Sequence, residues 1–286
     1  MYAITGITGK VGSALARTLL AAGQPVRAVV RDAAKGAAWA AQGCEIALAD
    51  MGDARALTRA FAGATGVFIL PPPEFDPAPG YPEARAVIGS ILAALTAARP
   101  AKILCLSAIG ADAVHDNLLS QRTLLEAALR ELPLPITFLR PAWFIDNAAW
   151  DVDSARETGI LHSYLMPMDR ALPMVAAQDV GEVGAGLLQQ DWSGMRVVEL
   201  EGPHRVTPDD LAAAFGRALG RPVRAVPVPR DTWESLFRAQ GMRNPGPRIR
   251  MLDGFNEGWI DFADGGRNAI KGRTDVVAVI AALVAN

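Results

Sequence analysis

Short apolar runs alternate with longer amphipathic stretches along the first half of the chain. Apolar runs of about 4–8 residues predict buried strands, and stretches with helical spacing of apolar positions predict helices. The expected strands are residues 2–5, 26–30, 46–49, 67–70, 102–107 and 136–139, and the expected helices are residues 11–22, 33–42, 54–61, 83–98 and 118–132. Strands that alternate with helices form βαβ units, so the pattern predicts a doubly wound α/β fold with a parallel sheet.

The alternation ends after about Pro141, where loops lengthen and prolines become frequent. Strands are expected here at residues 197–200 and 223–228, and helices at residues 208–219 and 231–239. We interpret this half as a smaller α+β lobe over the carboxyl edge of the sheet. The expected division is residues 1–150 and 151–286, and the segment around residues 172–200 could return to the sheet.

Charge and composition narrow the classes of partner. The chain has 28 basic and 30 acidic residues, a net charge of −2, which does not favour nucleic acid or an anionic membrane as a partner. Eight arginines fall within residues 217–250 against Asp231 and Glu234. No aromatic residues interleave them in a nucleic-acid-binding pattern, so a solvated face is expected, with an acidic partner as the alternative.

Cysteines, histidines and apolar runs bear on metals and location. Cys44 and Cys105 have no zinc or disulfide-scaffold spacing, and the three histidines have no ligand spacing, so no metal is expected. The longest apolar run, residues 276–285, is shorter than the roughly 18 residues that span a bilayer. The first residues have the pattern of a strand and not of a signal peptide. We therefore expect a cytoplasmic protein, with a homodimer left open.

A glycine-rich turn joins the first predicted strand to the first predicted helix. Its sequence is Thr5-Gly6-Ile7-Thr8-Gly9-Lys10-Val11-Gly12, a G-x-x-G-x-x-G spacing. Gly6 would take the tight turn, Gly9 would let backbone N–H groups approach a pyrophosphate, and Gly12 would let the helix pack on the strand. The helix N-terminus adds partial positive charge. The position of the motif predicts dinucleotide binding by Gly6, Thr8, Gly9, Lys10, Val11 and Gly12.

The end of the second strand indicates which dinucleotide binds. NAD-binding folds usually place an acid there for the ribose 2′-hydroxyl. Here Arg31 occupies that position, followed by Asp32 and Lys35, and a guanidinium suits a 2′-phosphate. NADP(H) is therefore expected, and NAD(H) is the alternative if Asp32 is the ribose acid. Asp50 and Met51, after the third strand, are expected near the adenine.

With these motifs the chain resembles the NmrA-like branch of the atypical short-chain dehydrogenases/reductases, in particular NADPH-dependent quinone and triphenylmethane-dye reductases. The matching segments are residues 5–12, 30–35, 104–108, 137–147, 172–175, 179–180, 199–203 and 207–211. The resemblance implies a Rossmann-like domain with a smaller substrate lobe. It also implies that the run Thr137 to Asn147 contacts the nicotinamide half of the cofactor.

The chain departs from classical short-chain dehydrogenases at the Tyr-x-x-x-Lys pair, in which lysine lowers the tyrosine pKa for proton transfer. None of its three tyrosines, Tyr2, Tyr81 and Tyr164, has a lysine four residues on. The resemblance places Arg122 and Glu126 in the corresponding helix, where the reductase relatives have His and Glu. Classical alcohol oxidation is therefore not expected.

The remaining candidates cluster after the later strands. Leu70, Pro71 and Pro72 follow the fourth strand and would wall the cofactor cleft. Ser107 ends the fifth strand and could hydrogen-bond the carboxamide or a substrate oxygen, or its own backbone. The expected nicotinamide contacts are Arg140, Pro141, Ala142, Trp143 and Phe144, and the expected acceptor pocket is Trp143, Phe144, Asn147 and Trp150. The catalytic residue is unknown, with Ser107 and Glu126 as candidates.

Two functions fit these motifs and the resemblance to the NmrA-like branch. The first is hydride transfer from NADPH to a small electron-poor acceptor such as a quinone, dye or enone, which relies on proximity and orientation more than on acid–base catalysis. The second is a non-catalytic NADP(H)-binding redox sensor, a type that the family also contains.

Overall fold

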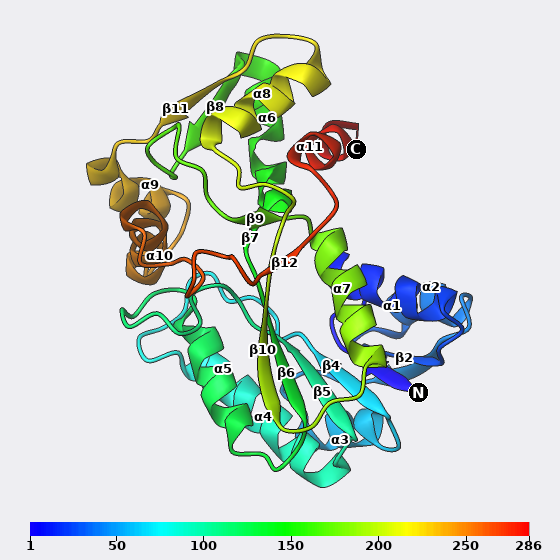
Figure 1. Cartoon of the computed structure of the whole chain (residues 1–286). Helices are drawn as coiled ribbons and strands as arrows, with labels where there is room; N and C mark the ends of the chain where they lie inside the picture. The colour runs from blue at the N-terminus through cyan, green and yellow to red at the C-terminus, as the bar shows by residue number, and fades with distance from the viewer. Residues whose placement is uncertain (286) are drawn as a thin grey trace.

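A computed structural model describes residues 1–285 and centres on one parallel sheet (Figure 1). Its eight strands follow the order β12-β10-β6-β5-β4-β1-β2-β3. They are β1 (Tyr2–Ile4), β2 (Val26–Val30), β3 (Glu45–Leu48), β4 (Gly66–Ile69), β5 (Lys102–Leu106), β6 (Ile136–Pro141), β10 (Met195–Glu201) and β12 (Ile270–Lys271). The order in which strands are added changes side at β1: β2 and β3 lie on one side of it, and β4, β5 and β6 lie on the other. Doubly wound folds bind their ligands at such a switch point.

Helices cover both faces of the sheet (Figure 1). One face carries α1 (Lys10–Ala21), α2 (Ala33–Ala40) and α7 (Ala177–Gln189), and the other carries α3 (Ala54–Phe61), α4 (Pro82–Ala98) and α5 (Ser120–Arg130). Side chains alternate along each strand, so two apolar cores form. Ile4, Phe68 and Leu104 belong to the core under α1 and α7, whereas Val67 and Phe138 belong to the core under α3, α4 and α5.

A second group of elements lies beyond the carboxyl ends of the strands, at the top of Figure 1. It contains α6 (Val152–Thr158), β8 (Ile160–Ser163), α8 (Pro208–Leu219), β11 (Arg224–Pro227), the 3-10 turn η2 (Arg230–Thr232), α9 (Trp233–Ala239), α10 (Gly246–Glu257) and α11 (Val276–Ala285). The strands β8 and β11 pair in parallel there. Between the two parts, β7 (Trp143–Phe144) pairs with β9 (Met174–Val175), and the 3-10 helix η1 (Ile145–Asp151) follows β7.

The chain returns to the sheet after this excursion. β10 runs parallel to β6, with Met195 opposite Ile136, and α7 packs against α1. Gly181 permits that packing, because a Cβ atom there would lie 2.6 Å from the Val11 carbonyl oxygen. The pattern of hydrophobic residues did not predict α7, because its three glycines lower helix propensity. Packing against α1 stabilises α7, because its own sequence favours a helix only weakly.

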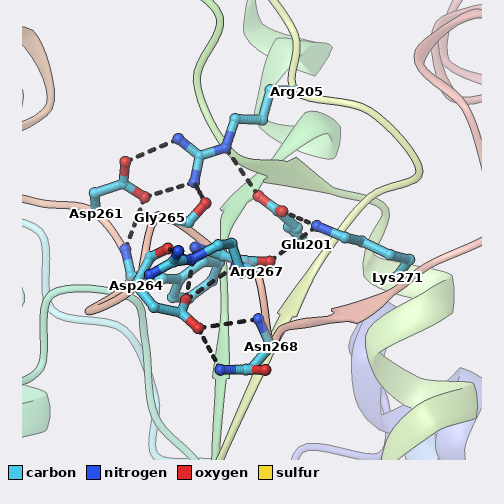
Figure 2. A network of polar contacts seen from close by, with 10 residues as sticks. Glu201, Arg205, Asp261, Asp264, Gly265, Arg267, Asn268 and Lys271 are labelled. Atoms are coloured by element: carbon cyan, nitrogen blue, oxygen red, sulfur yellow. Dashed lines mark hydrogen bonds and ion pairs between the residues drawn. The ribbon is translucent and has the colours of Figure 1, made fainter.

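A polar network fastens the last strand to the sheet (Figure 2). Glu201 is buried at the end of β10 and accepts hydrogen bonds from Arg205 and Lys271. Arg205 also holds Asp261 through two bonds of 2.8 Å. The Asp264 carboxylate accepts the backbone N–H groups of the turn that follows it. The network therefore ties the segment before β12 to β10.

Most predicted elements are present, with ends displaced by a few residues. The expected helix at 118–132 is shorter, as α5, and the expected strand at 197–200 is longer, as β10. The hydrophobic pattern did not predict β8, α10 or β12 either. Within residues 1–285, no helix is long and apolar enough to cross a membrane.

Candidate functional site

The glycine-rich turn has the geometry expected of a phosphate loop. Gly6 lies in the left-handed region at φ +64°, and the Gly9 N–H donates to the Gly6 carbonyl at 3.0 Å. Gly9 is the N-cap of α1 and has no side chain to cover the first N–H groups of the helix. A Cβ atom on Gly12 would lie 2.6 Å from the Gly6 carbonyl carbon, so only glycine fits. The loop thus presents a bare helix N-terminus to an anion.

The residues after β4 lie beside this loop. Thr5 Oγ1 donates to the Phe68 carbonyl at 2.9 Å and accepts from the Leu70 N–H at 2.8 Å. This pair of bonds ties the end of β1 to the end of β4 and brings Leu70 against Gly6. The predicted contacts here therefore meet at one edge of the sheet. Thr8, Gly9, Lys10 and Pro72 are exposed, Gly6 and Leu70 are half-buried, and Val11, Gly12 and Pro71 are buried.

At the end of β2, the structure separates the roles of the two charged neighbours. Asp32 is the N-cap of α2 and accepts the Ala34 N–H at 2.8 Å. Arg31 is exposed and has no hydrogen bond or ion pair within residues 1–285, and Lys35 is exposed one turn into α2. The Asp32 carboxylate is thus engaged in capping, whereas the Arg31 guanidinium is available to an anion. Asp50 is exposed after β3 and accepts the Gly52 N–H at 2.8 Å, and Met51 is half-buried beside it.

The first prediction concerns Arg31. Arg31→Ala is expected to weaken NADPH binding by about 10- to 100-fold and to leave NADH binding within about twofold, because a charge-assisted contact contributes roughly 1–3 kcal/mol. Both dissociation constants can be measured by isothermal titration calorimetry. Arg59→Ala, an exposed arginine in α3, is the matched control. Equal affinities for NADPH and NADH in the unmutated protein would contradict the NADP(H) preference.

Ser107, Glu126 and Arg140 meet in one buried network at the ends of β5 and β6. The Ser107 hydroxyl donates to Glu126 Oε1 at 2.5 Å, and Arg140 donates to both Glu126 oxygens at 2.9 and 2.8 Å. Arg140 also donates to Asp112 at 2.6 Å, and Arg130 donates to Glu126 at 3.2 Å. All the nitrogens of the Arg140 side chain therefore have carboxylate partners.

This arrangement keeps Glu126 ionised. Burial alone would raise its pKa, but the hydrogen bonds from Arg140 and Ser107 outweigh burial and hold the pKa of Glu126 below its ordinary value. The Arg140 pKa is raised by the same contacts with Glu126 and Asp112, against the effect of burial. A carboxylate with a lowered pKa and several donors on it has no proton to give near neutral pH. Its geometry suits holding Ser107 and Arg140 in place.

Arg122, one turn before Glu126, faces a different hollow. A cavity of about 140 Å³ lies between the segment after β4, α4 and α5, and Arg122 and Pro71 are among its lining residues. Arg122 makes no ion pair within residues 1–285, and burial lowers its pKa. A second hollow of about 220 Å³ lies between α8 and the start of α11, and none of the predicted cofactor residues lines it.

The aromatic segment after β6 crosses back toward the phosphate loop. Pro141 and Ala142 are buried, Trp143, Phe144 and Asn147 are half-buried, and Trp150 is exposed. Trp143 packs edge-to-face on Phe255 of α10, with ring centroids 5.2 Å apart. Trp143 is thus already partnered on one side by the second group of elements.

Asp146 connects this segment to two other parts of the site, and the sequence reasoning did not identify it. Its Oδ1 accepts Lys10 Nζ at 2.9 Å, and its Oδ2 accepts the Ala177 N–H at 2.8 Å. Asp146 therefore joins the start of α1, η1 and the start of α7. Asp146 lies within residues 137–147, a segment that matches the family, but no local feature of the sequence indicates its partners.

Asp151, at the end of η1, is a carboxyl group without a described hydrogen bond to its side chain. Burial raises its pKa to about 6 from an ordinary value of 3.8. Because the folded pKa is raised, ionised Asp151 destabilises the fold. The cost is absent below pH ~4, grows as pH rises toward 6 and is complete above it.

Asp151→Asn is therefore expected to raise the free energy of unfolding by about 1–3 kcal/mol near pH 8 and to have little effect near pH 4. Urea denaturation at both pH values measures this. Asp153→Asn, its exposed neighbour in α6, is the control and should show no such pH-dependent gain. An equal effect of Asp151→Asn at both pH values would contradict a raised pKa.

Together, the parallel sheet, the glycine loop at the switch point and the second lobe define a dinucleotide-binding domain of the short-chain dehydrogenase/reductase type. The model of the NmrA-like family matches residues 2–244, and the chain belongs to that family. This bears out the resemblance and the Rossmann-like α/β fold inferred from the sequence.

Individual proteins give the same picture. The chain is 28% identical over 247 residues to an NAD(P)H azoreductase of Xenophilus azovorans, covering 85% of this chain and 82% of the azoreductase. The solved NADPH-dependent quinone oxidoreductase of Escherichia coli, complexed with NADPH, superposes with a TM-score of 0.82 at 23% identity over 99% of each chain. The triphenylmethane reductase of Citrobacter sp., complexed with NADP(H), gives a TM-score of 0.81 at 22% identity, also over 99% of each chain.

Proposed function

We propose that this protein is an NADPH-dependent reductase of small, electron-poor acceptors such as quinones, dyes or enones. The observation that carries the proposal is the bare phosphate loop with Arg31 unpaired at the end of the neighbouring strand. The names of its relatives, an azoreductase and a quinone oxidoreductase, support the same class of acceptor.

The geometry of the glycine-rich loop supports the binding of NADP(H) by the residues proposed from the sequence. Gly6, Gly9 and Gly12 are proposed to hold a pyrophosphate at the N-terminus of α1. Gly6 takes the left-handed turn, Gly12 packs against the Gly6 backbone, and Gly9 leaves the first N–H groups of the helix uncovered, so that they would donate to the anion. Arg31 and Lys35 would hold the 2′-phosphate. The remaining proposed contacts are Thr8, Lys10, Val11, Asp50, Met51, Leu70, Pro71, Pro72, Ser107, Arg140, Pro141, Ala142, Trp143 and Phe144.

Bound NADPH would supply the hydride. The residues of the chain position the reactants, since Glu126 is held ionised and the Ser107 hydroxyl donates a hydrogen bond to it. Arg140 fixes the end of β6 and hence the start of the aromatic segment. An electron-poor acceptor needs no strong protein acid for hydride transfer, so orientation within the crevice is the expected source of rate enhancement.

The acceptor is proposed to lie between the cofactor domain, proposed at residues 1–150, and the smaller lobe, proposed within residues 151–286, from which α7, β10 and β12 return to the sheet. Its proposed walls are Trp143, Phe144, Asn147 and Trp150. The half-buried members come from β7 and η1, which connect the two parts of the chain.

Turnover tests the proposal directly. The absorbance of reduced nicotinamide is followed with purified protein, NADPH or NADH, and a naphthoquinone, a triphenylmethane dye or an azo dye. The expected result is NADPH consumption with at least one acceptor, faster than with NADH. Tight NADPH binding with no turnover on any acceptor would overturn the reductase and favour the cofactor sensor.

The cellular location and the oligomeric state of the protein are also proposals. Cys44 and Cys105 are buried and free, which fits a reducing compartment and a cytoplasmic protein. The Arg-rich segment is partly neutralised within the chain, because Arg230 and Arg250 share Asp253, Arg238 pairs with Glu234 and Arg243 pairs with Asp76. This favours a solvated face over a nucleic-acid partner. A homodimer can be checked by light scattering.

A further inference from the structure

Two large aromatic side chains remain exposed, and they contact each other. Phe75 is 50% exposed and Trp150 is 67% exposed, and their ring centroids lie 6.3 Å apart at an interplanar angle of 83°. The other strongly exposed large hydrophobic side chains within residues 1–285 are aliphatic: Leu48, Val114, Met195, Val197, Leu236 and Ile270. Phe75 and Trp150 are thus the two aromatic members of this set of exposed side chains, and they form one pair.

The pair joins two segments that leave the carboxyl edge of the sheet. Phe75 lies in the proline-rich segment after β4, and Trp150 lies in η1 after β6 and β7. The same two segments carry residues proposed for the cofactor cleft and the acceptor pocket. The rings therefore meet over the edge at which doubly wound folds bind their ligands.

Phe75 is held in place by its neighbours. The Glu74 carbonyl accepts Gln121 Nε2 of α5 at 3.0 Å. The Asp76 carboxylate accepts the N–H groups of Arg243 and Asn244 at 2.8 and 2.7 Å. Contacts on both sides thus fix the backbone that carries this exposed ring, and these contacts link the segment to α5 and to the second lobe.

Within residues 1–285, the other pairs formed by Phe, Tyr and Trp rings are closed by packing. Trp143 contacts the buried Phe255, and Tyr164 contacts the buried Trp233 and Phe237. By contrast, Phe75 and Trp150 contact each other edge-to-face and leave ring surface to solvent. A third flat ring can bury that surface by stacking, an arrangement that aromatic rings favour.

We propose that Phe75 and Trp150 form an aromatic gate that selects planar, fused-ring acceptors. The inference rests on the proposed reductase function and adds Phe75, which the sequence did not suggest, to the determinants of acceptor choice. The occupant is a flat aromatic small molecule that stacks on the pair as it enters the crevice. Small single-ring acceptors gain less from the pair because they cover less of it.

Steady-state kinetics with two quinones of similar reduction potential test the gate. Menadione presents a fused ring system, and a methylated benzoquinone presents a single ring. Phe75→Leu is expected to lower kcat/KM for menadione about tenfold through KM, with kcat, the benzoquinone kinetics and the NADPH dissociation constant unchanged. Trp150→Leu, in the proposed acceptor pocket, is expected to lower kcat/KM more for menadione than for the benzoquinone. Trp150→Phe should retain most of the menadione preference. Leu236→Ala, an exposed aliphatic side chain on α9, is the control and should change neither quinone.

An equal change for both quinones, or unaltered menadione kinetics in both leucine variants, would overturn the gate. If the unmutated protein reduces neither quinone, the proposed function fails for quinones, and binding then tests the gate alone. Menadione is titrated into the NADPH complex while tryptophan fluorescence is followed. Tighter binding to the unmutated protein than to Phe75→Leu supports the gate, and equal binding overturns it. Thermal unfolding of each variant separates lost stacking from lost folding.

Discussion

Gly12→Ala is expected to lose up to about 100-fold in NADPH affinity. The added Cβ atom would lie 2.6 Å from the Gly6 carbonyl carbon and 2.9 Å from the Ile7 Cα, both backbone atoms of the phosphate loop. Such a contact cannot be relieved by a side-chain rotation, so the loop or α1 must move. Overpacking of this kind costs about 1–3 kcal/mol or more, and each 1.4 kcal/mol is about tenfold in affinity.

Calorimetric titration with NADPH measures the loss, with thermal unfolding in parallel. Gly89→Ala is the matched control, because Gly89 lies within α4 and a Cβ atom there meets nothing within 4 Å. It should leave NADPH affinity unchanged and raise stability by up to about 1 kcal/mol. An NADPH affinity of Gly12→Ala equal to that of the unmutated protein would show that the loop does not hold the pyrophosphate.

Arg140→Met is expected to destabilise the fold by about 3–5 kcal/mol near neutral pH, since it leaves Glu126 buried without its main cation. Ser107→Ala should cost only about 1 kcal/mol, the usual contribution of one hydrogen bond. The double variant Arg140→Met with Glu126→Leu should recover much of the loss, because no unpaired charge remains in that pair. Urea denaturation gives all three free energies.

The pH dependence follows from the lowered pKa of Glu126. A lowered folded pKa contributes stability above the ordinary value of 4.5, and that contribution is lost as pH falls through the folded pKa. In Arg140→Met the unpaired Glu126 can take up a proton in acid. The stability difference between Arg140→Met and the unmutated protein should therefore shrink below pH ~5. A difference that stays constant from neutral to acid pH would mean that Glu126 does not carry the effect.

Much of the fold and part of the candidate site could be predicted from the sequence. β1 to β6, with the helices between them, follow from apolar runs and helical spacing, because each such element is encoded within its own residues. The phosphate loop follows from three glycines at fixed spacing. Elements with weak local signals were missed, such as α7 with its glycines and the short β12.

The sequence by itself determined the parallel α/β architecture, the family and the position of the glycine-rich loop before α1, since these depend on periodicity and on short-range backbone requirements. Only the tertiary structure decided which distant side chains meet. Lys10 reaches Asp146 across 136 residues, and Phe75 of the segment after β4 meets Trp150 of η1. Likewise, the Arg140 guanidinium donates its hydrogen bonds to the carboxylates of Glu126 and Asp112. Periodicity states which face a side chain occupies, but its partner depends on which strands and loops the complete fold places side by side.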